Sequence, residues 1–205
     1  MSDRTLPHFV LGYHGCDRAT AASVINGSAQ LTYDSHKYDW LGNGLYFWEN
    51  DPKRALLWAE ELKTRTGSRK VKHPAVIGAV IDLGYCLNLI ETENLQLLKS
   101  GYSLLERKIL DANLTLLKGE KKLELPKNLP GSGGNGDLLL RNLDCAVIEG
   151  IHEYMREQSE EPFDSVRGVF WEGENLYPNA GFAEKNHIQI CVRNQSQIKG
   201  FFYPR

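Results

Sequence analysis

Short apolar, β-branched runs near both ends of the chain, with segments of helical periodicity between them, constrain the fold more than any other feature. In the first half, strand-like runs cover residues 9–14 and 75–83. In the last quarter they cover residues 165–171, 187–193 and 198–203. Strands at the two ends with helices between them are typical of an α+β fold whose sheets meet around a cleft.

Capping residues and helical spacing mark the segments between these strands. Asn50-Asp51-Pro52 combines a cap residue with a proline suited to the first helical position, so a helix should begin at Pro52. Apolar residues recur in it at helical spacing and bury one stripe, with charged residues elsewhere: Ala55, Trp58, Ala59 and Leu62. We predict further helices over residues 18–25, 95–110 and 137–158, the last broken near Asp144.

The composition is that of an ordinary soluble domain. With 41% hydrophobic and 24% charged residues, the chain can bury a core without metal ions or disulfides. We therefore expect a single domain over residues 1–205. Lysine and arginine number 24 against 26 aspartate and glutamate residues, so no overall basic field attracts a nucleic-acid backbone, and any such contact must be local.

Cysteine spacing and hydropathy indicate the compartment. The four cysteines form no Cys-x-x-Cys pair and no zinc pattern: Cys16, Cys86, Cys145 and Cys191. We expect free thiols in a reducing compartment and no metal site. Residues 1–8 hold no apolar run of signal length, and no stretch approaches the roughly 20 apolar residues of a membrane helix. The sequence predicts a cytoplasmic protein without a membrane partner.

Two loops resemble ligand-binding segments. Gly131, Gly133 and Gly136 match the spacing of a dinucleotide fingerprint, but a polar segment with prolines precedes them where a buried strand is required. We interpret residues 117–137 as an exposed loop. A basic cluster is interpreted as a solvated loop able to make a local phosphate contact: Arg65, Arg69, Lys70 and Lys72.

Two motifs about thirty positions apart carry the functional signal. Residues 13–16, Tyr-His-Gly-Cys, and 42–48, Gly-Asn-Gly-Leu-Tyr-Phe-Trp, resemble two signatures of the poly(ADP-ribose) polymerase superfamily. The resemblance covers residues 9–62 and, more loosely, the C-terminal strands. It implies an ADP-ribosyltransferase fold, in which two small antiparallel sheets with flanking helices surround a cleft for NAD⁺, the ADP-ribose donor.

The residue types suit cleavage of the bond between ribose and nicotinamide, which leaves an oxocarbenium-like ion. A histidine can hydrogen-bond a ribose hydroxyl, a glycine lets backbone amides approach the carboxamide, and an aromatic ring can stack on the pyridinium. His14, Gly15 and Tyr46 are those types. The resemblance adds further NAD⁺ contacts, with a tryptophan as second ring of a nicotinamide sandwich: Cys16, Gly44 and Trp58.

The family's third triad member, usually glutamate, falls on the strand-like run 187–193. Alternation places four side chains of this run on the face opposite the apolar one: His187, Gln189, Cys191 and Arg193. By resemblance Gln189 takes the place of the catalytic glutamate, with His187 as the alternative and a further NAD⁺ contact. Glutamine carries no charge and cannot act as a base, which favours transfer of single units over polymer formation.

Residues 172–185 correspond to a family loop that helps to select the acceptor. Glu172, Glu174 and Glu184 are carboxylates that could replace the missing base. We rank Glu184 first among them.

The sequence therefore predicts an NAD-dependent ADP-ribosyltransferase that modifies a macromolecular acceptor, with RNA or DNA slightly favoured over protein. A compact domain of this kind resembles prokaryotic toxins, including toxin–antitoxin and phage-defence effectors, which implies an antitoxin or inhibitor partner. Three alternatives remain open. They are a non-catalytic module that binds NAD or ADP-ribose, a structural protein, and an NAD-dependent RNA 2′-phosphotransferase. His14, His187 and Arg193 favour the phosphotransferase, whereas the tyrosine motif argues against it.

Overall fold

The computed structural model describes residues 9–33, 35–64, 71–118, 120–130 and 137–205. The Gly131–Gly136 motif and Arg65, Arg69 and Lys70 of the basic cluster lie outside these residues. The elements follow in the order β1 (Phe9–Asp17), α1 (Arg18–Ile25), β2 (Leu45–Glu49), α2 (Pro52–Thr64), β3 (Pro74–Asp82), β4 (Cys86–Asn88), α3 (Thr92–Leu114), β5 (Asn128–Leu129), β6 (Leu140–Arg141), α4 (Asn142–Glu157), β7 (Ser165–Phe170), β8 (His187–Val192), a 3₁₀ turn (Gln195–Gln197) and β9 (Ile198–Phe202).

Strands from both ends of the chain join in one mixed sheet, which confirms the α+β class. The strand order is β4-β7-β8-β2-β1-β3-β9, and β5 and β6 form a separate two-stranded sheet. All neighbours in the large sheet are antiparallel except β4 and β7. The prediction of two small antiparallel sheets is therefore corrected, because β2 pairs with β8 on one edge and with β1 on the other.

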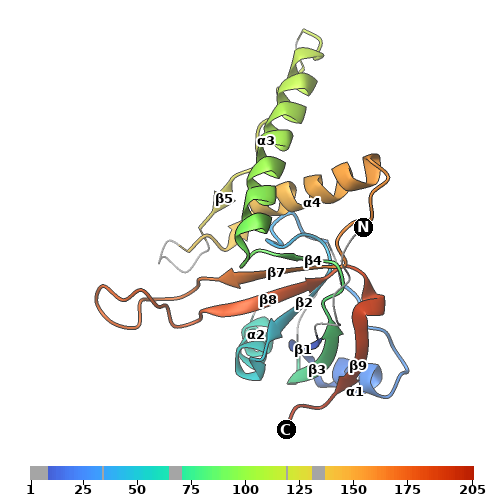
Figure 1. Cartoon of the computed structure of the whole chain (residues 1–205). Helices are drawn as coiled ribbons and strands as arrows, with labels where there is room; N and C mark the ends of the chain where they lie inside the picture. The colour runs from blue at the N-terminus through green and yellow to red at the C-terminus, as the bar shows by residue number, and fades with distance from the viewer. Residues whose placement is uncertain (1–8, 34, 65–70, 119, 131–136) are drawn as a thin grey trace.

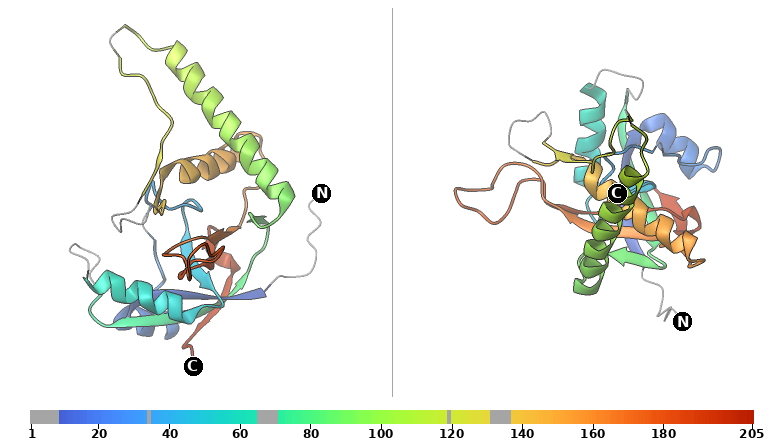
Figure 2. Two further views of the ribbon diagram at one scale, coloured as in Figure 1. Left: turned by 90° about the vertical axis from the view of Figure 1, so that its left-hand side faces the viewer. Right: turned by 90° about the horizontal axis from the view of Figure 1, so that it is seen from above.

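The junction between β1 and β2 is narrow. β1 pairs with β3 along its whole length, but with β2 only through Gly12 and Tyr13. Figure 2 shows β2 rising away from β1 and β3 beyond this junction. The separation of the two strands leaves main-chain groups of β2 available to side chains of β1.

Both faces of β2 and β8 are covered by packed side chains. Leu45 and Phe47 of β2 enter a core shared with α1 and β3, together with Ile190 of β8. Tyr46 and Cys191 point to the other face and enter a second core, beneath α4. The predicted alternation is thus observed, but the face expected to line a cleft is itself largely filled.

Helix α1 has the predicted bounds, and α2 begins at Pro52 as predicted. The prediction for residues 137–158 needs correction, because α4 begins at Asn142 and runs without a break past Asp144. The Asn128 side chain explains this start. Its Oδ1 accepts from the backbone N–H groups of Leu143 at 2.9 Å and Asp144 at 3.3 Å, which caps the helix from a distant segment.

Helix α3, with 23 residues, crosses α4 and extends beyond the rest of the molecule (Figure 1). Its contact with α4 is close at Gly101, where an added Cβ would overlap the Ile151 side chain. No helix among the described residues is both long and apolar enough to cross a membrane.

Candidate functional site

Three residues far apart in sequence, His14, Tyr46 and Gln189, lie on neighbouring strands of the large sheet. Their strands are adjacent in the order β8-β2-β1. In the β2–β8 ladder Trp48 is opposite Gln189, and Tyr46 is opposite Cys191. Tyr46 and Gln189 therefore share one face of the sheet as diagonal neighbours.

His14 is held at the junction of β1 and β2. Its Nδ1 lies 2.8 Å from the main-chain oxygen of Tyr46. Because a carbonyl oxygen only accepts, Nδ1 must carry the hydrogen, and Nε2 is left as an acceptor. Burial lowers the pKa of His14 against the opposing effect of this hydrogen bond, so the neutral form is favoured.

Tyr46 fastens the loop before β2. Its hydroxyl donates to the Gly42 carbonyl at 2.8 Å and accepts from the Leu41 N–H at 2.9 Å. Burial raises the pKa of Tyr46 well above its usual value, so the phenol stays protonated. The hydroxyl is thus occupied by the protein itself, and the aromatic ring is the part of Tyr46 suited to contact a ligand.

Gln189 is oriented by Trp40, a residue that the sequence analysis did not identify. The Trp40 indole N–H donates to Gln189 Oε1 at 2.6 Å. An indole nitrogen can only donate, so the amide oxygen must face Trp40 and the amide nitrogen must face away. Gln189 therefore presents N–H donors to its other neighbours.

Trp40 covers this part of the sheet. A Cβ added at Gly168, which pairs with Gln189, would lie 2.9 Å from the Trp40 ring. The Trp40 ring packs edge-on against Phe170 at 4.9 Å, and the Arg141 guanidinium lies over both rings. No motif marked Trp40, because its role depends on the course of the loop before β2.

The other residues of the two motifs serve packing. A Cβ at Gly15 would overlap the Ala55 carbonyl oxygen of α2, so glycine allows this helix to approach β1. Gly44 packs in the same way against Cys191 of β8. The Cys16 side chain is buried in the core beneath α1, and its contact with NAD⁺ stays a prediction.

Trp48 and His187 follow Tyr46 and Gln189 on the same face of the sheet. Together with Arg54 of α2 and Asn186, which directly precedes β8, we call them the Trp48–His187 cluster. Arg54 has 4% of its surface exposed, and its Cζ lies 5.5 Å from the centre of the Trp48 ring. The rings of Trp48 and His187 are 6.1 Å apart. The helical spacing predicted that the charged residues of α2 lie outside its buried stripe. Arg54 is an exception, because it precedes Trp58 by one turn and is buried.

Aromatic rings surround this cluster. His187 stacks on Phe170 with ring centres 5.2 Å apart and an interplanar angle of 20°. Trp58 lies 6.1 Å from Trp48, so the ring contact of Trp58 is with the cluster. A nicotinamide sandwich between Trp58 and Tyr46 stays a prediction.

Glu172, and not Glu184, reaches these residues. Both carboxylate oxygens of Glu172 accept from Arg54 Nη2, at 2.9 and 2.8 Å. Glu184 is exposed, and its backbone N–H bonds to Glu174 in the segment that projects beyond β7 and β8 (Figure 1). Glu172 is thus already paired with Arg54, and the ranking of Glu184 first as the base stays a prediction.

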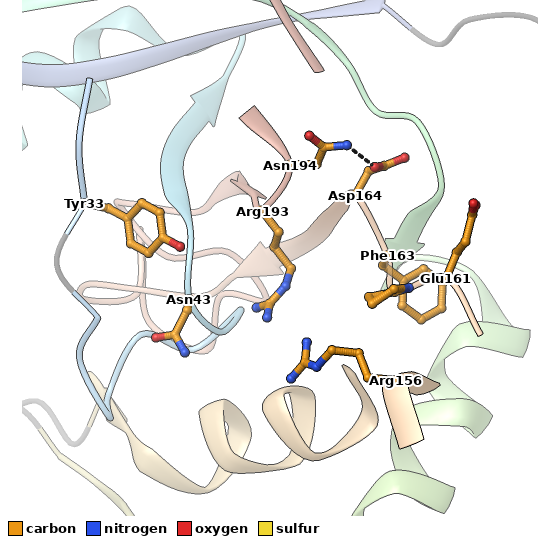
Figure 3. Close-up of a pocket in the computed structure, with 9 residues that line it drawn as sticks. Tyr33, Asn43, Arg156, Glu161, Phe163, Asp164, Arg193 and Asn194 are labelled. Carbon is orange, nitrogen blue, oxygen red and sulfur yellow. Dashed lines mark hydrogen bonds between the residues drawn. The ribbon is translucent and has the colours of Figure 1, made fainter. Parts of the chain in front are cut away.

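A polar cavity of about 420 Å³ lies at the opposite end of β8 (Figure 3). The guanidinium groups of Arg193 and Arg156 both point into it. Arg193 forms two hydrogen bonds to Glu149, at 2.5 and 3.1 Å. Gly42, whose φ of 80° favours glycine, separates this ion pair from the Tyr46 hydroxyl.

All four cysteines are free, and none is activated as a nucleophile. Burial raises the pKa of Cys16, Cys86 and Cys145 to about 11, and raises that of Cys191 further. A thiol with so high a pKa is almost fully protonated at neutral pH. Within the described residues, no group of three or more histidine, cysteine, aspartate or glutamate side chains is arranged to hold a metal ion.

Comparison with known proteins gives one informative relative. The chain is 30% identical over 206 residues to the "Uncharacterized protein MJ0359" of Methanocaldococcus jannaschii, with 91% of this chain and 83% of the archaeal protein covered. No family model and no solved structure matches the chain. The alignment covers nearly the whole chain.

Proposed function

We propose that this chain, which belongs to the same family as the archaeal protein MJ0359, binds NAD⁺ and transfers single ADP-ribose units to a macromolecular acceptor. One observation carries the proposal. His14, Tyr46 and Gln189, the residues that resemble the transferase triad, lie on three adjacent strands, and the His14 imidazole is bonded to the main chain of Tyr46. This adjacency of strands is what supports the proposal.

Each side chain has a distinct role in the proposed reaction. His14 Nε2 accepts a hydrogen bond from a ribose hydroxyl, and the Tyr46 ring stacks on the nicotinamide. The bond between the ribose C1′ and the nicotinamide nitrogen breaks, and its electron pair leaves with nicotinamide. An acceptor nucleophile then donates a lone pair to C1′, and the proton that it loses passes to solvent water. Glu172 is paired with Arg54 beside the Trp48–His187 cluster.

The biological setting extends this proposal. Transfer of ADP-ribose to RNA, DNA or protein in the cytoplasm would damage the host cell, so we infer a toxin or phage-defence effector and an antitoxin or inhibitor protein that covers the proposed site. Nucleic acid is our first choice of acceptor.

A second function, a module that binds NAD or ADP-ribose without turnover, is favoured by the orientation of Gln189. The amide oxygen faces Trp40, so the group presented to a ligand is an N–H donor. A donor binds a hydroxyl or carbonyl oxygen well, but it does not stabilise the positive charge that develops on the ribose.

Labelled NAD⁺ separates these functions. The protein is incubated with labelled NAD⁺ and a cell lysate, and aliquots are treated with nuclease or protease. If the protein is a transferase, we expect free nicotinamide, and label in material that nuclease or protease digests. Tyr46→Phe, which keeps the ring, should retain both, and Tyr46→Ala should lose both. Binding of NAD⁺ without nicotinamide release would leave the binding module.

Gln189→Glu provides an independent test. A carboxylate still accepts from the Trp40 indole, and it adds negative charge beside the ribose. For the enzyme we expect release of nicotinamide to rise at least tenfold. If neither the wild-type protein nor Gln189→Glu releases nicotinamide while both bind NAD⁺, the transferase proposal is wrong.

A further inference from the structure

Unpartnered buried polar atoms concentrate at one place in the molecule. Among the described residues, six buried side-chain nitrogen or oxygen atoms lack a hydrogen-bond partner, and five of them belong to the Trp48–His187 cluster. These five are Trp48 Nε1, Nε and Nη1 of Arg54, Asn186 Oδ1 and His187 Nε2. Each such atom costs about 1–3 kcal/mol of folding free energy, so the cluster opposes folding. A cluster of this kind points to a ligand that satisfies it.

The five atoms combine donors with acceptors. Arg54 and Trp48 can only donate hydrogen bonds. His187 Nδ1 lies 2.6 Å from the Lys185 carbonyl oxygen and so carries the hydrogen, which makes the unpartnered Nε2 an acceptor. Asn186 Oδ1 is a second acceptor. A matching ligand must carry acceptor and donor groups together on one edge.

The rings around the cluster restrict the ligand further. The rings contact one another in series, Trp58 against Trp48, Trp48 against His187, and His187 stacked on Phe170. Aromatic surfaces beside mixed donors and acceptors suit a planar ring with a hydrogen-bonding edge. Unpaired nucleobases are such rings, and proteins recognise them by stacking and by bonds to their edges.

We propose that the Trp48–His187 cluster binds an unpaired nucleobase. The inference rests on the proposed function in one respect, because it makes single-stranded nucleic acid the acceptor of the ADP-ribose. Along β2 and β8, Trp48 and His187 of the cluster follow Tyr46 and Gln189 on the same face. A base bound there lies next to the ribose that the proposed site holds.

The segment between β7 and β8 covers the cluster and must move to admit a base. Two ion pairs fasten it to α2. Glu172 bonds to Arg54, and Lys185 lies 3.2 Å from Glu61. The Lys185–Glu61 pair is more than one-third exposed, and such surface pairs contribute at most about 1 kcal/mol. Beyond these contacts the segment projects away from the sheet (Figure 1).

Binding can be measured without NAD⁺. Homopolymeric single-stranded decamers of each base, a duplex and nicotinamide are titrated into the protein, and tryptophan fluorescence is recorded because Trp48 and Trp58 flank the site. We expect one base to bind most tightly. His187→Phe keeps the stacking on Phe170 but removes Nε2, and it should weaken binding at least tenfold, as expected for one buried hydrogen bond.

His152→Phe is the matched control. His152 Nε2 is the sixth unpartnered atom, but His152 belongs to the buried side of α4 and packs on Phe163, away from the cluster. His152→Phe should leave binding unchanged. Each substitution removes one unsatisfied nitrogen and one Nδ1–H bond to a main-chain carbonyl, so the two should change the melting temperature similarly. Equal weakening by the two substitutions would overturn the proposal, as would equal binding of all decamers, binding of nicotinamide alone or no binding.

The binding assay and the NAD⁺ assay fail independently. If the protein binds one base but releases no nicotinamide, the nucleobase site is supported and the transferase proposal is wrong. If the label enters only protease-sensitive material, the transferase function is supported and the nucleobase site is wrong.

Discussion

A single hydrogen bond determines which nitrogen of His14 is available for chemistry. Nδ1 is bound to the Tyr46 carbonyl, so only Nε2 can contact a ligand. An asparagine amide nitrogen can replace Nδ1, and a glutamine amide oxygen can reach towards the position of Nε2. This difference separates the structural role of His14 from its proposed ligand contact.

At the residue scale, we predict that His14→Asn keeps the fold and lowers NAD⁺ binding or nicotinamide release about tenfold to a hundredfold, the cost of one lost polar contact. His14→Gln should retain more of the activity. Isothermal calorimetry with NAD⁺ and thermal melts of both variants provide the measurements. Equal activity in the asparagine variant and the wild-type protein would contradict a role for Nε2.

At the element scale, the contact of α2 with β1 depends on the absence of a side chain at Gly15. In Gly15→Ala the new Cβ overlaps the Ala55 carbonyl oxygen, a backbone atom that cannot move without the helix. We expect a loss of about 1–3 kcal/mol in the free energy of unfolding, measured with urea. Gly150→Ala, in α4, is the control, because nothing lies within 4 Å of its added Cβ. It should be neutral or stabilise by up to about 1 kcal/mol.

The start of α1 is tied to the segment before β3 by one carboxylate. Asp17 accepts from the backbone N–H groups of Ala19, Lys72 and His73, and these bonds lower its pKa to about 2. Asp17→Ala should reduce the free energy of unfolding by about 1–2 kcal/mol at pH 7. Since the folded pKa is depressed, this contribution is present above pH 4 and is lost as the pH falls towards 2. Asp111→Ala, at an exposed site on α3, should change stability by less than about 0.5 kcal/mol.

At the scale of the whole molecule, buried histidines make stability depend on pH. Burial lowers the pKa of His152 to about 4, with Arg193 acting in the same direction and Glu149 opposing it. Burial also lowers the pKa of His14 and His187. Below about pH 6.5 these histidines therefore bind protons more readily in the unfolded chain than in the folded chain. The free energy of unfolding decreases as the pH falls through this range.

We expect His152 alone to remove up to about 3 kcal/mol of unfolding free energy between pH 6.5 and pH 4. Urea unfolding at pH 7, 6 and 5 measures the slope. His152→Phe should reduce the loss over this interval, while the contributions of His14 and His187 remain. An unchanged slope in this variant would show that His152 does not resist protonation in the folded state.

The fold class and most strands and helices were predictable from the sequence, because hydrophobic periodicity and capping are local properties. Helix α1, the start of α2 and strand β8 illustrate this. The start of α4 was not predictable, because its cap comes from the distant Asn128. The short β4 carries too few residues to show a period.

The sequence by itself determined which residue types were available for a site, and its motifs around His14 and Tyr46 indicated where to look for that site. Only the tertiary structure decided how they are used. It joined the predicted sheets through β2, turned the Gln189 amide by means of Trp40, and buried Arg54 against Glu172. The reason is physical: periodicity depends on near neighbours, whereas pairing, burial and hydrogen-bond direction depend on residues that only folding brings together.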